Sequence, residues 1–437
     1  MSKAASMSWK TETDEIHDRR AAALEQGGAE SIARHHAKGK LTVRERVDAL
    51  LDEGSFDEIG RGAGVMGEDG FEPANYVLGF GKIDGRRVVV GGEDFTMKGG
   101  SPSAAGFRKS VYAEDVALQY KVPLVRLQGG AGGAGGGAGK ASLPARVLER
   151  QRFISVAKTM GTVPVASAAL GAVAGMPAGR LVASHFSVMS RSTAQILTAG
   201  PAVVARAMGE QKTKEDLGGA QVHTKNGTVD NGAEDEASCF AEIRRFLSYL
   251  PSHIGELAPV VGCDDPVDRQ AEALLEIVPR DRRRAFDMRR LLALVLDEAS
   301  FFEIGRGYGR SQITGLARVN GQPVGVWAND GKHLAGSMTA DGAQKARRFM
   351  ELAQTFHLPI LSFVDEPGFM IGSQAEKEAT IRHGANAVLT AAMTTVPWCS
   401  VMVRRSFGVA QAAHYGPDGY VLAWPSAEQG PLPVEGG

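Results

Sequence analysis

An internal repeat constrains this chain more than any other feature of its sequence. Residues 50–64 read LLDEGSFDEIGRGAG and residues 295–309 read VLDEASFFEIGRGYG, at an offset of 245. Further matches follow at an offset of 236, and Gly175 meets Gly408 at an offset of 233. Small loop deletions produce such a drift, and the period is far too long for a solenoid. The sequence therefore predicts two homologous domains.

Each half alternates between strand and helix patterns. Hairpins are predicted with turns at Asp84-Gly85 and Asn320-Gly321, because both dipeptides favour tight turns between strands. Helices are predicted over residues 103–120, 148–160, 341–356 and 380–395. Buried parallel strands are predicted over residues 122–127 and 358–364. This alternation predicts an α/β fold of layered domains with right-handed crossovers. We expect the domains to span residues 1–256 and 257–437.

Composition excludes several classes of protein. The 437 residues are 43% hydrophobic and 23% charged, with a formal net charge of −1, which gives no electrostatic case for binding nucleic acid or an anionic membrane. No apolar run approaches the roughly 20 residues that span a bilayer, and the N-terminus lacks the apolar core of a signal peptide. Cys239, Cys263 and Cys399 lie far apart, without metal-ligand spacing. We expect a reduced, cytoplasmic protein without disulfides or a metal site.

Two stretches at equivalent places in the repeat indicate where ligands bind. VPVASAALGAVAGMPA covers residues 163–178, and VPWCSVMVRRSFGVAQ covers residues 396–411. Each begins as an apolar strand and ends in small residues, which let the backbone approach a ligand closely. A helix that starts after such a turn presents N–H groups without partners inside the helix. These turns are therefore suited to holding an oxyanion.

The glycine-rich segment QGGAGGAGGGAGK, residues 128–140, follows a predicted strand. It is not a Walker A loop, because Lys140 is followed by Ala141 instead of Ser or Thr. A mobile loop is the alternative to a ligand-binding role. Its counterpart in the repeat, VDEPGFMIGSQAE at residues 364–376, follows the equivalent strand, at the strand end where α/β sheets bind ligands. This equivalence favours ligand binding.

Few side chains are suited to acid–base chemistry. His223, in DLGGAQVHTKNG, is a candidate general base, although a structural hydrogen bond is the commoner role of a loop histidine. Lys109 and Lys345 hold equivalent positions, and we expect both to be charges on a helix surface. The pattern favours chemistry in which backbone N–H groups hold a developing enolate.

Nearly the whole chain resembles the carboxyltransferase β-type subunits of biotin-dependent acyl-CoA carboxylases, such as the propionyl-CoA and methylcrotonyl-CoA enzymes. The resemblance rests on several motifs together: KLTVRERVDALLDEGSFDEIG, EDFTMKGGS, the GGA after Gln128, DLGGAQVH, FFEIGRGYG, VDEPGF, IRHGA and AWPSAE. It implies an α/β fold built as a tandem repeat of two crotonase-like (ClpP/crotonase superfamily) β-β-α domains, the second ending short of the family's last helical segment.

The resemblance also implies the reaction and its partners. CO2 passes from carboxybiotin to the α-carbon of an acyl-CoA, which the N-terminal domain binds, while the C-terminal domain binds biotin. The chain has no Met-Lys-Met carrier motif, so biotin is expected on a partner, the biotin carboxylase/biotin carboxyl carrier subunit. The family assembles as a hexamer of two stacked trimers, with the active site shared between subunits. No metal is implied in this subunit.

The resemblance assigns residues to two oxyanion holes. Gly175 and Met176 would hold the acyl enolate oxygen, and Val409 and Ala410 would hold the ureido oxygen of biotin. The substrate-binding residues carried over are Gly100, Gly129, Gly130, Ala131, Ala174, Pro367, Gly368, Phe407 and Gly408.

The chain departs from the family pattern at its turns. This chain has QGGAG where the family has SGGAR, and GMPAG where the family has GGAVY. It has Ala412 where the family has an Asp that helps to set acyl specificity. Backbone donors survive side-chain replacement, so both oxyanion holes remain available. Two alternatives stay open: a biotin-dependent decarboxylase or transcarboxylase subunit, and a divergent, non-catalytic CoA-binding scaffold.

Overall fold

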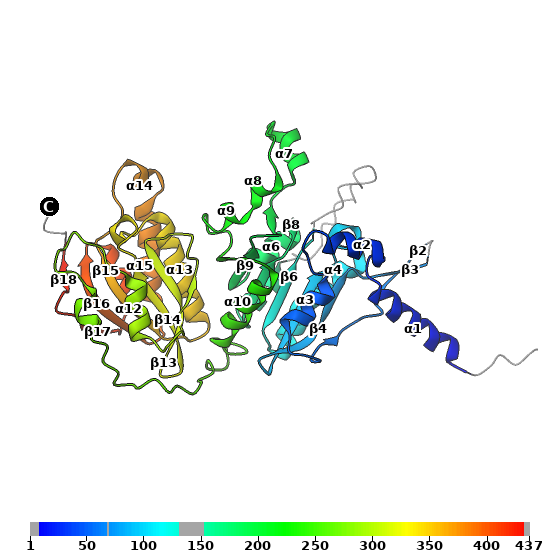
Figure 1. Ribbon diagram of the computed structural model, residues 1–437, viewed down its shortest axis with the longest axis horizontal. Coiled ribbons are helices and arrows are strands. Elements are labelled where there is room, and N and C mark those ends of the chain that lie inside the picture. Colours follow the sequence, from blue (N-terminus) through cyan, green and yellow to red (C-terminus); the bar gives the residue numbers. More distant parts are fainter. Residues whose placement is uncertain (1–7, 68–69, 131–152, 432–437) are drawn as a thin grey trace, which may run out of the picture. The chain divides into compact units, whose positions relative to one another are not determined.

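The computed structural model describes residues 8–67, 70–130 and 153–431 (Figure 1). The chain forms two compact units. The first comprises Met1–Ala220 and Ala233–Arg244, and the second comprises Gln221–Gly232 and Arg245–Gly437. Each unit is built around a seven-stranded mixed sheet.

The first sheet has the strand order β1-β4-β5-β6-β7-β9-β11. Its strands are β1 Asp57–Glu58, β4 Tyr76–Ile83, β5 Arg86–Glu93, β6 Leu124–Gln128, β7 Val165–Ala169, β9 Phe186–Ser190 and β11 Asn231–Ala233. An antiparallel β4–β5 hairpin leads into the parallel neighbours β6, β7 and β9. Two short ladders lie outside this sheet: β2 Gly64–Gly67 with β3 Gly70–Pro73, and β8 Ala172–Ala174 with β10 Gln195–Leu197.

The second sheet has the order β12-β13-β14-β15-β16-β17, with β18 pairing β16. Its strands are β12 Phe302–Ile304, β13 Gln312–Val319, β14 Gln322–Asn329, β15 Ile360–Glu366, β16 Trp398–Phe407, β17 Tyr420–Ala423 and β18 Glu428–Gly430. It repeats the first plan, since an antiparallel β13–β14 hairpin leads into parallel β15 and β16. Both predicted hairpins are confirmed, because Asp84-Gly85 and Asn320-Gly321 form their turns with positive φ.

Helices connect and cover the strands. In the first unit they are α1 Lys10–Leu24, α2 Gly28–His36, α3 Val43–Leu50, η1 Lys98–Gly100, α4 Ala104–Tyr120, α5 Ile154–Met160, α6 Met176–Val182, α7 Pro201–Met208 and α8 Lys214–Gly218. Helices α9 Ala220–His223 and α10 Glu236–Ser248 have residues in both units. The second unit holds α11 Leu274–Ile277, α12 Met288–Val295, η2 Leu334–Gly336, α13 Ala340–Thr355, α14 Ser373–Lys377, α15 Thr380–Met393 and η3 Ala410–His414.

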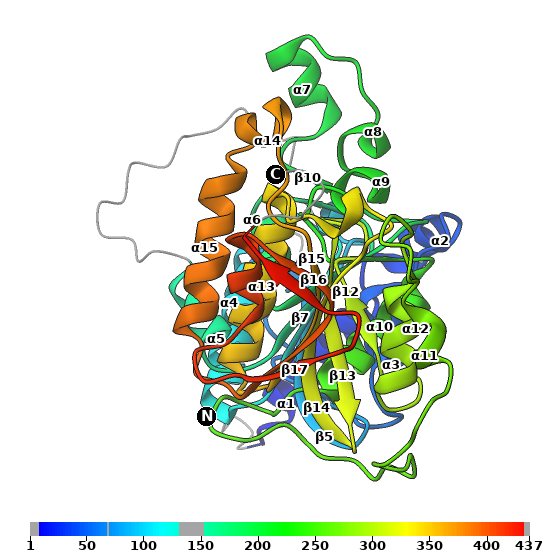
Figure 2. The ribbon, with the colours of Figure 1, turned by 90° about the vertical axis from the view of Figure 1, so that its left-hand side faces the viewer.

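Alternation along the strands fixes which helix covers which face. In β14, Val324 and Val326 join the core with Leu291 and Leu292 of α12, whereas a Cβ on Gly325 would lie 2.8 Å from the Phe349 ring of α13. Figure 2 shows α13 and α15 on one side of this sheet and α12 on the other. The second unit is therefore a layered α/β domain, as the sequence predicts.

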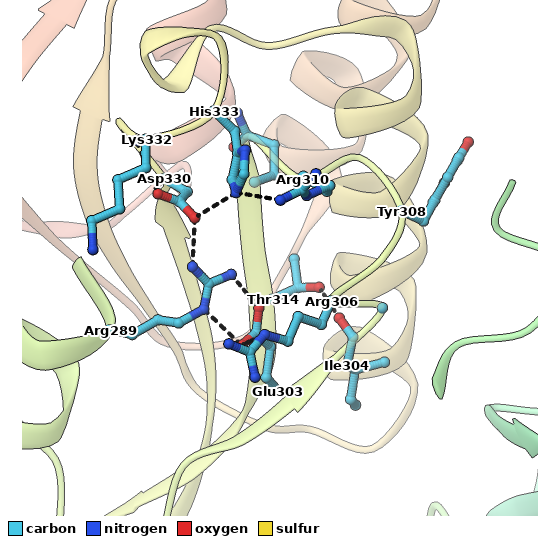
Figure 3. A network of polar contacts seen from close by, with 12 residues as sticks. Arg289, Glu303, Ile304, Arg306, Tyr308, Arg310, Thr314, Asp330, Lys332 and His333 are labelled. Atoms are coloured by element: carbon cyan, nitrogen blue, oxygen red, sulfur yellow. Dashed lines mark hydrogen bonds and ion pairs between the residues drawn. The ribbon is translucent and has the colours of Figure 1, made fainter. Parts of the chain in front are cut away.

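The repeat extends to individual contacts. In the first unit Arg44 of α3 donates to both carboxylate oxygens of Glu58, at 2.9 and 3.1 Å. In the second, Arg289 of α12 donates to Glu303 in the same way, at 2.6 and 2.8 Å, and also to Asp330 (Figure 3). Both arginine–glutamate pairs stand at the sequence offset of 245. The ion pair ties the helix to the first strand of each sheet.

The prediction that Lys109 and Lys345 are surface charges is wrong. Only 9% and 6% of their surfaces are exposed. Lys109 Nζ donates to Gly60 O at 3.2 Å, and Lys345 Nζ donates to Gln312 O at 2.7 Å and Tyr308 O at 3.1 Å. Burial lowers the pKa of Lys109 to about 8 and that of Lys345 to about 7. These lysines fasten loops to helices, a role that helical periodicity alone does not reveal.

Candidate functional site

The carboxyl ends of parallel strands in the first unit bring four of the predicted residues together. Gly129 and Gly130 follow β6, and Gly130 O accepts a hydrogen bond from Ala174 N at 3.2 Å. A Cβ on Gly100 would lie 2.7 Å from Gly130 Cα, so this close approach requires glycine. Ala131 and the rest of the glycine-rich segment to Lys140 lie outside the described residues.

The first predicted oxyanion turn lies directly after this cluster. Gly175 has φ 66° and ψ −133°, which favours glycine, and helix α6 begins at Met176 with Pro177 in its first turn. The first N–H groups of a helix have no acceptor inside that helix. Met176 N–H is therefore placed at a helix start, as an oxyanion donor needs to be.

The second predicted turn has the same form in the second unit. Phe407 ends β16, Gly408 has φ 64° and donates from its N to Gly430 O at 3.2 Å, and Val409 and Ala410 open the η3 turn. Gly408 N–H is thus occupied, which leaves the next two amides as the candidate donors. Val409 is 64% exposed, whereas Ala410 is buried.

The loop after β15 reaches this second turn. A Cβ on Gly408 would lie 3.9 Å from Gly368 Cα, and a Cβ on Gly368 would lie 3.9 Å from Phe407 O. Pro367 is the residue between Gly368 and the end of β15 at Glu366. The structure therefore brings the predicted residues of the second unit together, as it does in the first.

A buried carboxyl group that the sequence analysis did not single out lies beside the first cluster. Glu93 ends β5 with 6% of its surface exposed, and its Oε2 accepts from Gly129 N at 3.3 Å. Burial raises its pKa to about 7, although the Gly129 hydrogen bond opposes the shift. The available signal was a charged residue at the end of the apolar run RRVVVGGE.

Two arginines share one carboxylate behind the same turn. Glu114 of α4 is fully buried and pairs with Arg126 of β6 and Arg180 of α6, each at 3.0 Å. Arg126 Nη1 also donates to Arg180 O and Ala183 O, which satisfies carbonyls at the end of α6. Helix α6, which carries Met176, is thus held by buried ionic contacts.

Beneath the second turn the buried polar groups are of another kind. A hydrogen bond of 2.9 Å joins Nδ1 of His414, at the end of η3, to Ser362 Oγ. Nε2 of His414 lies 3.5 Å from Glu366 Oε2. Its ring stacks on Trp327 at a centroid distance of 3.9 Å. Glu366 Oε1 also accepts from Gly368 N at 2.9 Å, which fixes the loop beside Gly408. Neither Glu366 nor His414 was identified from the sequence.

Each unit has a turn with a positive-φ glycine after a parallel strand, at Gly175 and at Gly408. Within the described ranges, no group of three His, Cys, Asp or Glu side chains is placed to hold a metal ion. His223, the candidate general base, lies in helix α9. The class of protein is therefore a tandem α/β repeat with an equivalent glycine turn in each unit.

The chain belongs to the carboxyl transferase domain family, whose model matches residues 34–437. It is 36% identical over 425 residues to the propionyl-CoA carboxylase beta chain of Cereibacter sphaeroides, covering 95% of this chain and 82% of the relative. It is also 33% identical to the methylmalonyl-CoA decarboxylase subunit alpha of Veillonella parvula, covering 94% and 82%.

Solved structures agree with this family. The crystal structure of transcarboxylase 12S, a hexamer with methylmalonyl-coenzyme A bound, matches with a TM-score of 0.89 and 30% identity, covering 99% of this chain and 85% of that one. A single-chain, multi-domain long-chain acyl-CoA carboxylase matches with a TM-score of 0.85 and 29% identity, over 97% of this chain and 43% of that one.

These relatives confirm the resemblance and the predicted fold of two crotonase-like domains. The protein is an acyl-CoA carboxyltransferase of the biotin-dependent type, and the subunits of this kind use acyl-CoA together with biotin on a partner subunit. Of the helices in the described part of the chain, none is long and apolar enough to cross a membrane.

Proposed function

We propose that the two equivalent turns divide the carboxyl transfer between them. The turn at Gly175 and Met176, in the N-terminal domain (residues 1–256), holds the enolate oxygen of the acyl-CoA. The turn at Val409 and Ala410, in the C-terminal domain (residues 257–437), holds the ureido oxygen of biotin. The observation that carries the proposal is the repeated sequence of parallel strand, positive-φ glycine and helical turn.

The chemistry follows from these donors. Carboxybiotin would supply the carboxyl group by cleavage of its N1–carboxyl bond, and the Val409 and Ala410 amides would stabilise the negative charge that moves onto its ureido oxygen. The α-carbon of the acyl-CoA would lose its proton to the biotin ureido anion that remains after the carboxyl group has left. The resulting enolate, held by Met176 N–H, would form the new C–C bond with the carboxyl carbon. Preorganised donors stabilise this charge without reorganisation at the moment of reaction.

The partners we propose follow from the relatives. Biotin arrives on a biotin carboxylase/biotin carboxyl carrier subunit, and the chain assembles as a hexamer, as the transcarboxylase 12S core does. We expect a biotinylated partner in a pull-down of the tagged protein. Carboxylase and decarboxylase relatives share this chemistry in opposite directions, so the partner that co-purifies decides the physiological direction.

The substitution Met176→Pro tests the first turn. Proline fits the first turn of a helix and keeps a helical φ, but it has no N–H to donate. We expect kcat for carboxylation of propionyl-CoA by the reconstituted holoenzyme to fall about 10²- to 10³-fold. Met176→Ala keeps the N–H and is the matched control, expected within about twofold of wild type. Equal activity of the two variants would remove Met176 from the oxyanion hole.

A further inference from the structure

A small cavity lies directly behind the first turn. About 20 Å³ of it is accessible to the centre of a water molecule. Its lining comes from segments far apart in the sequence and includes Glu93, Ser110, Met176, Pro177 and Arg180. The accessible part has room for one small group and not for a long alkyl chain.

The cavity contains a buried cation with an unused donor. Arg180 is 4% exposed, and its Nη1 donates to Ser110 Oγ at 2.8 Å while its Nε lies 3.0 Å from Glu114 Oε1. Its Nη2 has no hydrogen-bond partner within the described residues. A buried guanidinium N–H without an acceptor is costly, and a ligand that accepts from it removes that cost.

The local charge balance favours an anion in the cavity. Among the described residues, Glu114 is the one carboxylate that both Arg126 and Arg180 contact. Across the cavity, Glu93 forms no ion pair with Arg180 among the described residues, and burial raises its pKa to about 7. When Glu93 is protonated, one of the two buried positive charges is incompletely compensated among the described residues, and a carboxylate ligand would compensate it.

We propose that this cavity is a carboxylate subsite, in which Arg180 Nη2 binds the α-carboxylate of a methylmalonyl- or malonyl-type acyl-CoA. The inference rests on the proposed role of Met176, because a thioester oxygen on Met176 N–H places its α-carbon beside the cavity that Met176 and Pro177 help to line. Arg180 is then a specificity-determining residue for the carboxylated acyl-CoA, whether that is product or substrate.

Isothermal titration calorimetry on the full chain tests the subsite. The two ligands compared are methylmalonyl-CoA and propionyl-CoA, which differ by one carboxylate. We expect wild type to bind methylmalonyl-CoA more tightly. Arg180→Met leaves Glu114 paired with Arg126, and it should weaken methylmalonyl-CoA about tenfold or more while changing propionyl-CoA less than about twofold. Arg206→Met, at an exposed arginine of α7, is the matched control and should change neither affinity.

Two further variants keep the test decisive if Arg180→Met fails to fold. Arg180→Lys keeps the charge and should retain part of the preference for methylmalonyl-CoA. Glu93→Gln removes negative charge facing the ligand and should strengthen methylmalonyl-CoA binding alone. Equal effects of these variants on both ligands, or no preference in wild type, would overturn the carboxylate subsite. Failure of wild type to bind either thioester would instead overturn the proposed function of the turn.

Discussion

The two units share a frame but differ in what they bury beneath their turns. Asp52 accepts from Asp84 N and Gly85 N, and Asp297 accepts from Asn320 N and Gly321 N at the same place in the repeat. Below the ligand-binding turns this equivalence ends. The first unit buries Glu93, Glu114, Arg126 and Arg180, whereas the second has Asn329, Met350, Ser362 and Ala413 at the corresponding offsets of 236 and 233.

This difference separates two tasks. The repeated contacts hold the hairpin in each unit, and both units keep a turn with a positive-φ glycine, Gly175 or Gly408. The contacts that are not repeated determine which side chains lie beside each turn. In the first unit these include Arg180, which lines a cavity, and in the second they are Ser362, Glu366 and His414, which contact one another. Under the proposed function, the shared glycine turns serve reactivity, and the buried side chains that differ between the units serve the choice of ligand.

The largest effect should come from a contact that only the first unit has. Arg46 of α3 pairs with Glu236 at 2.6 Å with 1% and 6% side-chain exposure, whereas Leu291 stands at the equivalent place in the second unit. Glu236→Gln leaves a buried cation without its partner and should lower the free energy of unfolding by about 3–5 kcal/mol. Urea denaturation measures this.

The exposed pair between Arg34 and Glu30 supplies the control for that experiment. Glu30→Gln should cost under about 1 kcal/mol, because exposed ion pairs contribute little. A Glu236→Gln variant as stable as the Glu30→Gln variant would mean that the Arg46 pair does not distinguish the two units.

A smaller, pH-dependent effect should come from the equivalent lysines. Burial lowers the pKa of Lys345 to about 7 and of Lys109 to about 8, both below the ordinary lysine value. From those values up to about 10.4, the unfolded chain binds more protons than the folded one, so stability rises with pH. Lys345→Met should flatten this rise more than Lys109→Met does, because the lower folded pKa gives the wider interval.

Urea midpoints at pH 6, 7.5 and 9 measure the slopes of wild type and both variants. If stability depends on pH in Lys345→Met as it does in wild type, the ammonium group of Lys345 is as well solvated in the folded protein as in the unfolded chain.

The smallest effect should be the same in both units. Asp52→Ala and Asp297→Ala each remove an acceptor for two backbone N–H groups of a hairpin turn. Asp52 also accepts from Arg244 Nη2 at 2.9 Å, so both variants are compared in an Arg244→Met background that removes this extra contact. Each should cost about 1 kcal/mol, and the two costs should agree within about 0.5 kcal/mol. Thermal melting of the two variants side by side checks this, and a twofold or larger disagreement would show that the repeated geometry conceals different energetics.

The sequence carries the features that repeat or that depend on the backbone. The drifting offsets predict two units, Asp84-Gly85 and Asn320-Gly321 predict the hairpins, and small residues around Gly175 and Gly408 predict the close-approach turns. These signals are local, because φ preferences and apolar runs act within a few residues.

The buried charges escaped sequence reasoning for a physical reason. The Arg180 cavity collects side chains from β4, β5, α4 and α6, and nothing local marks Glu114 and Arg126 as partners. A charge on a helix usually faces water, which is why Lys109 and Lys345 were expected at the surface. Only the tertiary packing shows which charged side chain points inward.

The most direct test of the division between the two turns is the kinetics of methylmalonyl-CoA decarboxylation with free biotin as acceptor, in Met176→Pro and Val409→Pro. Val409 has φ −70°, so proline fits there and removes one N–H. We predict that the KM for biotin rises about fivefold or more in Val409→Pro and stays within about twofold in Met176→Pro, with the opposite pattern for methylmalonyl-CoA. Equal changes in both KM values for both variants would contradict the division.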